Sequence, residues 1–309
     1  MNLTFIDLFS GIGGFRVGME LAGFNCIFSN DYDPFAAKTY QTWYGSHNHV
    51  TKSLWDIDIK RDIPNHDILC GGFPCQPFSQ AGKKLGFADN KQGDLFDALI
   101  QVIKSKKPKV VFLENVSHIT TYDNFNTIDH INRQLERNGY LGSWIKINAK
   151  YWVPQNRRRV YFLYFSKSKL KFNKLKKLSL EEKLNDISFQ PDKKIKYFSS
   201  IKEKNPAREL QIGKKTWDCL KRLKIENKRK GNGFGYTLLK DFKLPRKLSV
   251  NEALLLMGFN NQIAKKYGFK NGFPQVVSNT QAYKQLGNSV VPQVIYELGM
   301  LLRDEISVN

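Results

Sequence analysis

Residues 3–15 read LTFIDLFSGIGGF, an apolar run followed by a glycine-rich turn. The segment Leu3–Leu8 has the length and apolar character of a buried strand. A strand that ends in such a turn before a helix lets the backbone approach a ligand without interference from Cβ atoms. A dinucleotide fingerprint would have a third glycine at the position of Arg16, so the turn disfavours a nicotinamide cofactor. The alternative interpretation is that these glycines form a plain tight turn that binds no ligand.

Further apolar runs along the first 165 residues predict strands, with helical patterns between them. These runs are Asn25–Ser29, Asp67–Cys70, Lys109–Leu113 and Arg159–Phe165. Apolar residues in Asp94–Ser105 recur at the spacing of a helix with one buried face. Such alternation predicts an α/β fold with a doubly wound, mainly parallel sheet, whose ligands bind at the carboxyl ends of the strands.

The charge of the chain is concentrated in one region. The 309 residues contain 49 Lys and Arg against 28 Asp and Glu, a formal charge of +21. Residues 167–247 contain 25 Lys and Arg against 9 Asp and Glu, a net charge of +16. A solvated lysine-rich surface is one interpretation, but a surface that faces phosphates explains the whole segment better. We therefore divide the chain into domains at 1–166, 167–244 and 245–309, with the last returning to the first domain.

The cysteine pattern and the hydropathy exclude several classes of protein. The four cysteines form no Cys-x-x-Cys pair and have no histidines at zinc spacing, so neither a disulfide framework nor a metal site is expected. No apolar run approaches the roughly 20 residues of a membrane span. A folded, cytoplasmic protein with reduced thiols and no membrane partner is expected.

Reactive residue types follow the predicted strands. Asp31 ends the second strand, 20 residues after Gly11, where a carboxylate can bind ribose hydroxyls. Cys75 lies in the loop Gly71–Ser79 between two prolines, and we interpret it as a nucleophile, with a structural cysteine as the alternative. Glu114 ends another strand and suggests proton transfer. The run Gln155-Asn156-Arg157-Arg158-Arg159 can bind an anion or stabilise a thiolate, and Cys26 and Cys219 are interpreted as packing residues.

Together these motifs resemble those of a known family. Phe9–Phe15, Phe73–Ser79, Glu114–Val116, Gln155–Arg159 and Gln285–Val290, in this order, closely resemble the successive motifs of the DNA (cytosine-5) methyltransferases, particularly the compact bacterial modification enzymes. The resemblance covers about residues 3–165 and 245–302. It implies a Rossmann-like fold that uses S-adenosyl-L-methionine and releases S-adenosyl-L-homocysteine, with the basic middle segment as a small irregular target recognition domain.

The resemblance also implies roles in cofactor binding. Phe9 and Tyr32 would contact adenine, Asp31 the ribose, and Asp56 the adenine amino group. The residues expected in the cofactor site are Phe9, Gly11, Ile12, Gly13, Gly14, Asp31, Tyr32, Asp56, Ile57, Pro74, Asn288, Ser289 and Val290. Relatives more often have Glu and Trp where this chain has Asp31 and Tyr32, and both changes preserve hydrogen bonding or stacking.

By the same resemblance, Cys75 would add to carbon 6 of a flipped-out cytosine and Glu114 would deliver a proton to N3. Arg159 would bind O2 of the base and Arg157 would favour the thiolate. The residues expected on double-stranded DNA are Gln76, Ser79, Lys228, Arg229, Lys230, Tyr236 and Thr237. Where many relatives have a Ser/Thr-Arg-Gly step, this chain has Asn90-Lys91-Gln92, which moves a phosphate contact to Lys91.

Other functions explain the sequence less well. Family members that methylate transfer RNA carry a Cys-Phe-Thr element, whereas Cys219 is followed here by Leu220 and Lys221, which favours DNA. A catalytically inactive DNA-binding regulator would not need Cys75 and Glu114. A different Rossmann enzyme explains neither the Phe-Pro-Cys loop nor the charge. The resemblance thus implies a monomeric, nucleoid-associated modification enzyme of a restriction-modification system, in which a cognate restriction endonuclease would act on the same site.

Overall fold

The computed structural model describes residues 3–74, 95–121, 126–188, 238–239 and 246–307. The chain divides into two compact units, the first made of residues 1–195 and 289–309 and the second of residues 196–288. The large sheet belongs to the first unit.

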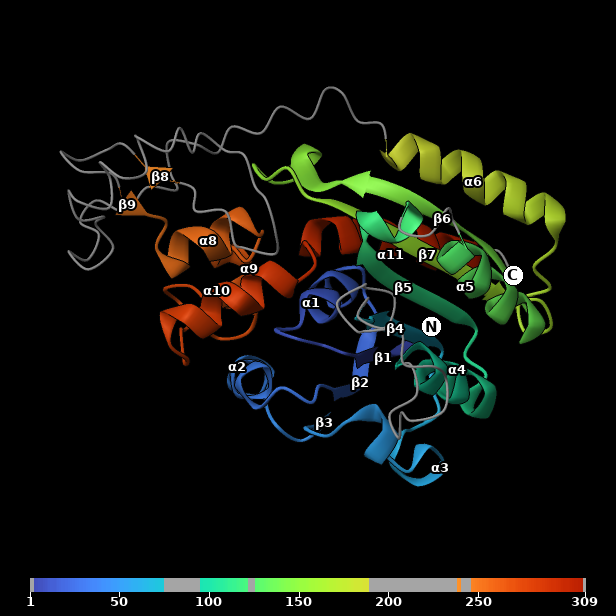
Figure 1. Cartoon of the computed structure of the whole chain (residues 1–309), viewed down its shortest axis with the longest axis horizontal. Helices are drawn as coiled ribbons and strands as arrows, with labels where there is room; N and C mark the ends of the chain where they lie inside the picture. Colours follow the sequence, from blue (N-terminus) through green and yellow to red (C-terminus); the bar gives the residue numbers. More distant parts are fainter. Residues whose placement is uncertain (1–2, 75–94, 122–125, 189–237, 240–245, 308–309) are drawn as a thin grey trace. The chain divides into compact units, whose positions relative to one another are not determined.

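Seven strands form this sheet. In chain order they are β1 (Thr4–Leu8), β2 (Asn25–Asn30), β3 (His49–Val50), β4 (Ile68–Gly72), β5 (Val110–Val116), β6 (Tyr140–Asn148) and β7 (Arg158–Ser166). Their order across the sheet is β3-β2-β1-β4-β5-β7-β6 (Figure 1). The strands from β3 to β5 pair in parallel, whereas β7 runs antiparallel to both β5 and β6. The sheet is therefore mainly parallel, as the sequence predicts.

Helices of the first unit lie between its strands and after the last of them. In chain order they are α1 (Gly14–Leu21), α2 (Pro34–Tyr44), α3 (Ile59–Asp62), α4 (Leu95–Lys106), α5 (Asn126–Arg137), α6 (Lys174–Ser188) and α11 (Pro292–Ser307), with short 3-10 turns η1 (Leu54–Asp56), η3 (Ser117–Thr120) and η4 (Ala149–Tyr151). Local sequence fixes their starts: Asp33 accepts hydrogen bonds from the first free amides of α2, and Pro34 follows it. Among the described helices, none has both the length and the apolar character needed to cross a membrane.

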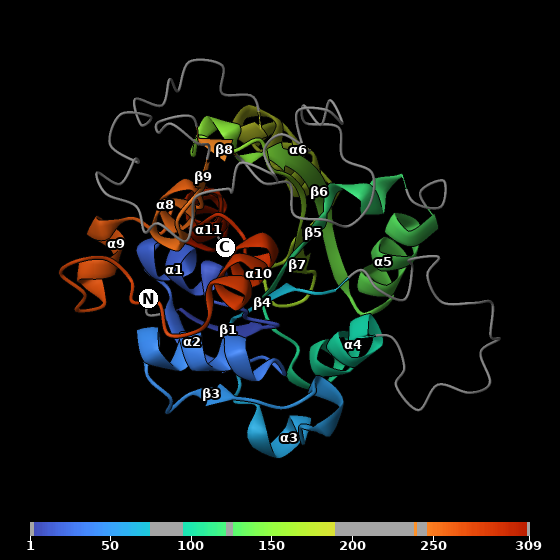
Figure 2. The ribbon, with the colours of Figure 1, turned by 60° about the vertical axis from the view of Figure 1, so that its left-hand side comes forward.

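Helices pack on both faces of the sheet. On one face, Leu8 and Leu113 share a core with Leu99 of α4 and Ile131 of α5. On the other face, the ring of Phe15 in α1 meets that of Phe112 in β5 edge to face, with centroids 5.0 Å apart, and α11 packs along α1. Figure 2 shows α4 and α5 on one side of the central strands and α1 on the other. The doubly wound α/β fold is confirmed.

Two strands, β3 and β6, do not follow from the apolar pattern. β6 lies at the edge of the sheet, where most of its residues are half-exposed or exposed, so no continuous apolar run marks it. Gly142 allows close pairing, because a Cβ there would lie 2.0 Å from the Leu163 carbonyl oxygen of β7. The long β6–β7 ribbon therefore extends the parallel sheet in antiparallel fashion.

The second unit has short elements in its described part. The strands β8 (Leu238–Leu239) and β9 (Arg246–Lys247) pair antiparallel, and the helices are α8 (Val250–Leu256), α9 (Asn261–Lys266) and α10 (Asn279–Asn288). Ser249 and Glu252 form a reciprocal capping box that starts α8. The Tyr283 hydroxyl donates to the Leu248 carbonyl and holds α10 against the start of α8.

The compact units and the division by charge fall at different residues. Helix α6 packs against β6 in the first unit, although it lies within the basic segment 167–244. Residues 245–288 cluster with the second unit, and only 289–309 return to the first. The compact units do not show which residues contact DNA. The division into a catalytic segment (1–166), a DNA-reading segment (167–244) and a returning segment (245–309) therefore stays a prediction.

Candidate active site

The candidate site lies at the carboxyl edge of the sheet. In the pairing register, Leu8 at the end of β1 lies beside Gly71 of β4, and Gly72 lies beside Glu114 of β5. Because β7 runs the other way, its first residues lie at the same edge, with Arg159 paired to Val116. The pairing register therefore brings together strand ends that are far apart in the sequence.

The glycine turn after β1 has the backbone conformation that only glycine adopts without strain. Gly11 and Gly13 have φ angles of 54° and 79°, and the amide of Gly13 donates to the Ser10 carbonyl at 2.8 Å. A Cβ at Gly11 would meet no atom within 4 Å, so this residue faces open space among the described residues. Phe9 also has a positive φ, of 55°, and its side chain packs against the core.

Asp31 at the end of β2 faces this turn. Its carboxylate accepts hydrogen bonds from the amide of Gly11 at 2.8 Å and from the amide of Asp33 at 2.9 Å. Burial raises the pKa of Asp31, and the two backbone amides partly oppose that rise. Asp31 therefore lies against the glycine turn and helps to hold it, while its contact with the ribose stays a prediction.

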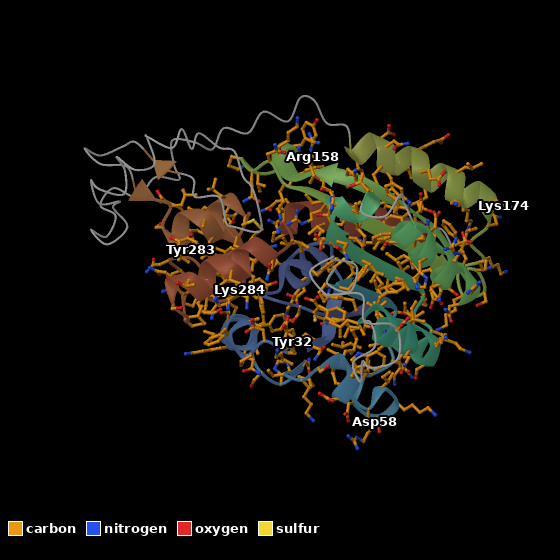
Figure 3. The ribbon with its side chains drawn as sticks, in the orientation of Figure 1. Tyr32, Asp58, Arg158, Lys174, Tyr283 and Lys284 are labelled. Carbon is orange, nitrogen blue, oxygen red and sulfur yellow. The ribbon has the colours of Figure 1, made fainter. Side chains whose placement is uncertain are left out.

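The other residues expected in the cofactor site differ in their exposure. Tyr32 follows Asp31 directly and is 68% exposed, so its ring presents an open aromatic face (Figure 3). Asp56 is exposed, whereas Ile57 is buried. Pro74 is half-buried at the end of the described loop after β4.

The end of the chain returns to the glycine turn. A Cβ on Gly14 would lie 2.7 Å from Val290 Cγ2 and 2.9 Å from Ser289 Oγ, so both residues pack directly against the start of α1. Ser289 and Val290 are buried. Asn288 ends α10 in the second unit and is exposed, and its contact with the cofactor stays a prediction.

Glu114 and Arg159 form an ion pair beside β4. Arg159 Nε lies 3.0 Å from Glu114 Oε1, and both side chains are largely buried. The other carboxylate oxygen reaches over β4, since a Cβ at Gly72 would lie 3.3 Å from Glu114 Oε2. Gly72 begins the Gly-Phe-Pro sequence that leads to Cys75. The structure therefore brings two of the predicted catalytic residues into contact.

Arg157 links this pair to the glycine turn. Its guanidinium donates to the Ser289 carbonyl, and Ser289 packs on Gly14. Its backbone amide donates to Asn148 Oδ1 at 3.1 Å, so the end of β6 fixes the start of β7. Arg157 is thus connected through Ser289 to the predicted cofactor turn, and its charge acts on Glu114.

Burial sets the electrostatics of the charged cluster. Burial raises the pKa of Glu114, while Arg159 and Arg157 partly offset that rise. Burial and the neighbouring Arg159 lower the pKa of Arg157 to about 10, against the opposing effect of Glu114. A carboxyl group with a raised pKa is suited to donate a proton near neutral pH.

Asn115 connects the cluster to the loop before Cys75. Its side-chain amide donates to the Phe73 carbonyl at 3.0 Å, and its Oδ1 accepts from the amide of Val116 at 2.8 Å. Asn115 is buried, and its bond to the Phe73 carbonyl is shielded from water. Asn115 lies within the motif Glu114–Val116, but the sequence assigns it no role. A side-chain amide that bonds to the backbone leaves no signal of its own in the sequence.

Nine predicted site residues lie outside the described residues. They are Cys75, Gln76, Ser79, Lys91, Lys228, Arg229, Lys230, Tyr236 and Thr237. Of the described cysteines, Cys26 and Cys70 are both buried, and burial raises the pKa of each thiol, for Cys26 to about 12. A thiol with such a raised pKa is a poor nucleophile, so neither competes with Cys75 for that role.

Comparison with known proteins gives consistent matches along the chain. The family model of the C-5 cytosine-specific DNA methylases matches residues 3–243 and 238–302. The Type II methyltransferase M1.ScrFI of Lactococcus lactis subsp. cremoris is 38% identical over 95% of this chain and 76% of its own length. The Type II methyltransferase M.HhaI of Haemophilus parahaemolyticus is 33% identical over 97% of this chain and 95% of its own length.

The fold is also found among solved structures. The Dnmt2 methyltransferase of S. pombe superposes with a TM-score of 0.73 at 18% sequence identity, over 98% of this chain and 99% of that one. At this identity the likeness concerns the fold, and it agrees with a Rossmann-like methyltransferase.

Proposed function

Because the chain belongs to the C-5 cytosine-specific DNA methylases and is a DNA (cytosine-5)-methyltransferase, we propose that it acts through a covalent bond from Cys75 to carbon 6 of a flipped-out cytosine. The methyl group comes from S-adenosyl-L-methionine and is placed on carbon 5, within a specific sequence of double-stranded DNA. The observation that carries the proposal is the buried Glu114–Arg159 ion pair beside the strand end that leads to Cys75.

Cytosine chemistry explains why this cluster is needed. Carbon 5 is a poor nucleophile until a group adds to carbon 6 and makes an enamine. The Cys75 thiolate forms the bond to carbon 6, and the electron pair of the carbon 5–carbon 6 double bond moves toward N3. Glu114, in its protonated form, transfers a proton to N3, and burial favours that form by raising the pKa of Glu114 against the effect of Arg159 and Arg157. Because the thiolate attacks perpendicular to the base plane, the cytosine has to leave the duplex stack.

The two arginines position the reacting groups. A guanidinium has five N–H donors, so Arg159 can pair with Glu114 and still donate to O2 of the base. Arg157 adds positive charge that favours the Cys75 thiolate. After methylation a base removes the carbon 5 proton and Cys75 leaves as a thiolate while the carbon 5–carbon 6 double bond reforms. N3 returns its proton to Glu114.

The residues of the glycine turn fit S-adenosyl-L-methionine. The open space at Gly11 accommodates a ligand close to the backbone, and the exposed ring of Tyr32 can stack on adenine. Asp31 lies between them with a carboxylate that can accept ribose hydroxyls. When bound, the cofactor supplies an electrophilic methyl group and leaves as S-adenosyl-L-homocysteine. Phe9, Ile12, Asp56, Ile57, Pro74 and Asn288 are proposed to complete its site.

Asp31→Ala is expected to weaken S-adenosyl-L-methionine binding by about 1.5–3 kcal/mol, the usual worth of hydrogen bonds to a charged group. Isothermal calorimetry on the free protein measures this change. The matched control is Asp67→Ala, because Asp67 also accepts from a backbone amide, that of Thr4, but at the opposite edge of the sheet. An unchanged affinity in Asp31→Ala would show that the carboxylate does not bind the ribose.

Lys228, Arg229 and Lys230 are proposed to contact phosphates, while Tyr236 and Thr237 are proposed to reach base edges. Replacing the three basic residues with Gln should lower the slope of log affinity against log salt by about three, since each lost phosphate contact lowers it by about one. Fluorescence anisotropy with a duplex at several salt concentrations gives the slope. The control replaces Lys104, Lys106 and Lys107 near the end of α4. Equal slopes in both triple variants would place the DNA contact elsewhere.

We further propose that the enzyme acts as a monomer in the cytoplasm, associated with the nucleoid, beside an endonuclease that cuts the same sequence. The Type II methyltransferases to which it is similar support this setting. Bisulfite sequencing of DNA from a methylation-free host that expresses the protein tests the proposed function as a whole. One methylated sequence motif is expected with the wild-type chain and none with Cys75→Ala. Unmethylated DNA from cells that contain the folded wild-type protein would contradict the proposal.

A further inference from the structure

The glycine turn is held from two sides. Asp31 bonds the amide of Gly11 on one side. On the other side lies Tyr44, the last residue of α2, whose hydroxyl donates to the Ile12 carbonyl at 3.0 Å. A Cβ at Gly13 would lie 2.4 Å from Tyr44 Cε2, so the tyrosine ring packs directly on the left-handed residue of the turn.

Arg16 fixes the position of this ring. Its guanidinium carbon lies 4.8 Å from the centroid of Tyr44 and 5.5 Å from that of Tyr40, and its Nε pairs with Glu20 at 2.9 Å. The Tyr40 and Tyr44 rings meet edge to face, with centroids 4.8 Å apart. A guanidinium over aromatic faces is an attractive contact that gains strength when it is shielded from water. Arg16 therefore occupies the position of the missing third glycine and has a packing role there.

We infer that Tyr44, held by Arg16, is a positioning residue that fixes the glycine turn in the conformation that binds the cofactor. The inference rests on the proposed binding of S-adenosyl-L-methionine at this turn. Glycine populates several backbone regions about as readily as the left-handed one, so contacts with neighbouring residues have to select the left-handed conformation of Gly11 and Gly13. The Tyr44 hydroxyl orients the Ile12 peptide and the Tyr44 ring limits the movement of Gly13. A turn that is ordered before binding loses less conformational entropy when the ligand binds.

Tyr44→Phe tests this role, because it preserves the ring and removes the hydrogen bond to Ile12. The dissociation constant and the KM for S-adenosyl-L-methionine are expected to rise roughly three- to tenfold, as the loss of one hydrogen bond implies. The kcat at saturating cofactor and the KM for DNA are expected to stay within about twofold. Tyr44→Leu, which also removes the ring and its contact with Arg16, is expected to raise the dissociation constant further.

Tyr140→Phe is a closely matched control. The Tyr140 hydroxyl also donates to a buried backbone carbonyl 32 residues earlier, that of Pro108, at 2.8 Å, but at the start of β6. Both variants should lower the melting temperature, and only Tyr44→Phe should weaken cofactor binding, measured well below that temperature.

The outcomes separate the inference from the proposed function. Equal cofactor affinity in wild type, Tyr44→Phe and Tyr140→Phe would overturn the positioning role while leaving the proposed cofactor in place. An equal loss of affinity in both variants would show a general effect of stability and would also overturn it. A wild-type protein that binds no S-adenosyl-L-methionine would instead contradict the proposed function itself.

Discussion

Replacing Cys75 with Ala is expected to reduce methyl transfer by a factor on the order of 10⁴–10⁶, the scale of loss when an enzyme that works through a covalent intermediate loses its nucleophile. The reason is that no other group can form the bond to carbon 6 that makes carbon 5 reactive. Binding of cofactor and of DNA should persist, because the covalent step alone needs the sulfur. Transfer of tritiated methyl groups to DNA, followed over several decades of rate, measures the loss.

The other cysteines provide the controls for this prediction. Cys26→Ala and Cys219→Ala should retain activity, since Cys26 is buried with a raised pKa and Cys219 lies in a sequence setting typical of a packing residue. An active Cys75→Ala enzyme would contradict the covalent mechanism. If Cys75→Ala were active and a folded Cys26→Ala or Cys219→Ala variant were inactive, the role of nucleophile would belong to that other cysteine.

Glu114→Gln is expected to reduce kcat by about 10²–10⁴, the usual contribution of general acid catalysis. The amide has nearly the same shape and can donate a hydrogen bond, but it cannot transfer a proton to N3. The KM for cofactor should change little, because Glu114 lies at the end of β5 and Asp31 at the end of β2. Single-turnover methylation of a duplex measures the rate. The control is Glu136→Gln, an exposed carboxylate on α5.

The pH dependence gives this prediction a second, independent readout. Burial raises the pKa of Glu114 above that of an ordinary glutamate, against the effect of Arg159 and Arg157. The protonated fraction therefore persists at higher pH than usual and falls as the pH rises through that pKa. A rate that depends on this proton should decline over the same range in the wild type and should not in Glu114→Gln. The same decline in both enzymes would assign it to another group.

Much of the fold could be predicted from local sequence. The predicted strand Lys109–Leu113 became β5, and the predicted helix Asp94–Ser105 agrees closely with α4, because both have strong apolar periodicity. β5 continues to Val116 because its last residues pair with β7, a long-range contact that no local pattern shows. The edge strand β6 was missed for a related reason, since its half-exposed residues resemble those of a surface segment.

The candidate site was predicted as a set of residues but not as a set of contacts. Glu114 and Arg159 were expected to contact different atoms of the base, and the ion pair between them follows from the antiparallel register of β5 and β7. The contact of Arg157 with Ser289 joins segments 132 residues apart. Sequence motifs specify which residue types lie at the strand ends. The pairing register of the strands, and the return of the C-terminal segment to the sheet, decide which of these side chains come into contact.

The central claim is that Cys75 bonds to carbon 6 of the target cytosine during methyl transfer. The most direct measurement incubates the wild-type enzyme with S-adenosyl-L-methionine and a duplex that carries 5-fluorocytosine at the target position, then maps the product by mass spectrometry. Fluorine cannot leave as a proton does, so a stable adduct of enzyme and methylated DNA should accumulate, with the cross-link on the peptide that contains Cys75. An active enzyme that forms no adduct, or an adduct on another cysteine, would contradict this mechanism.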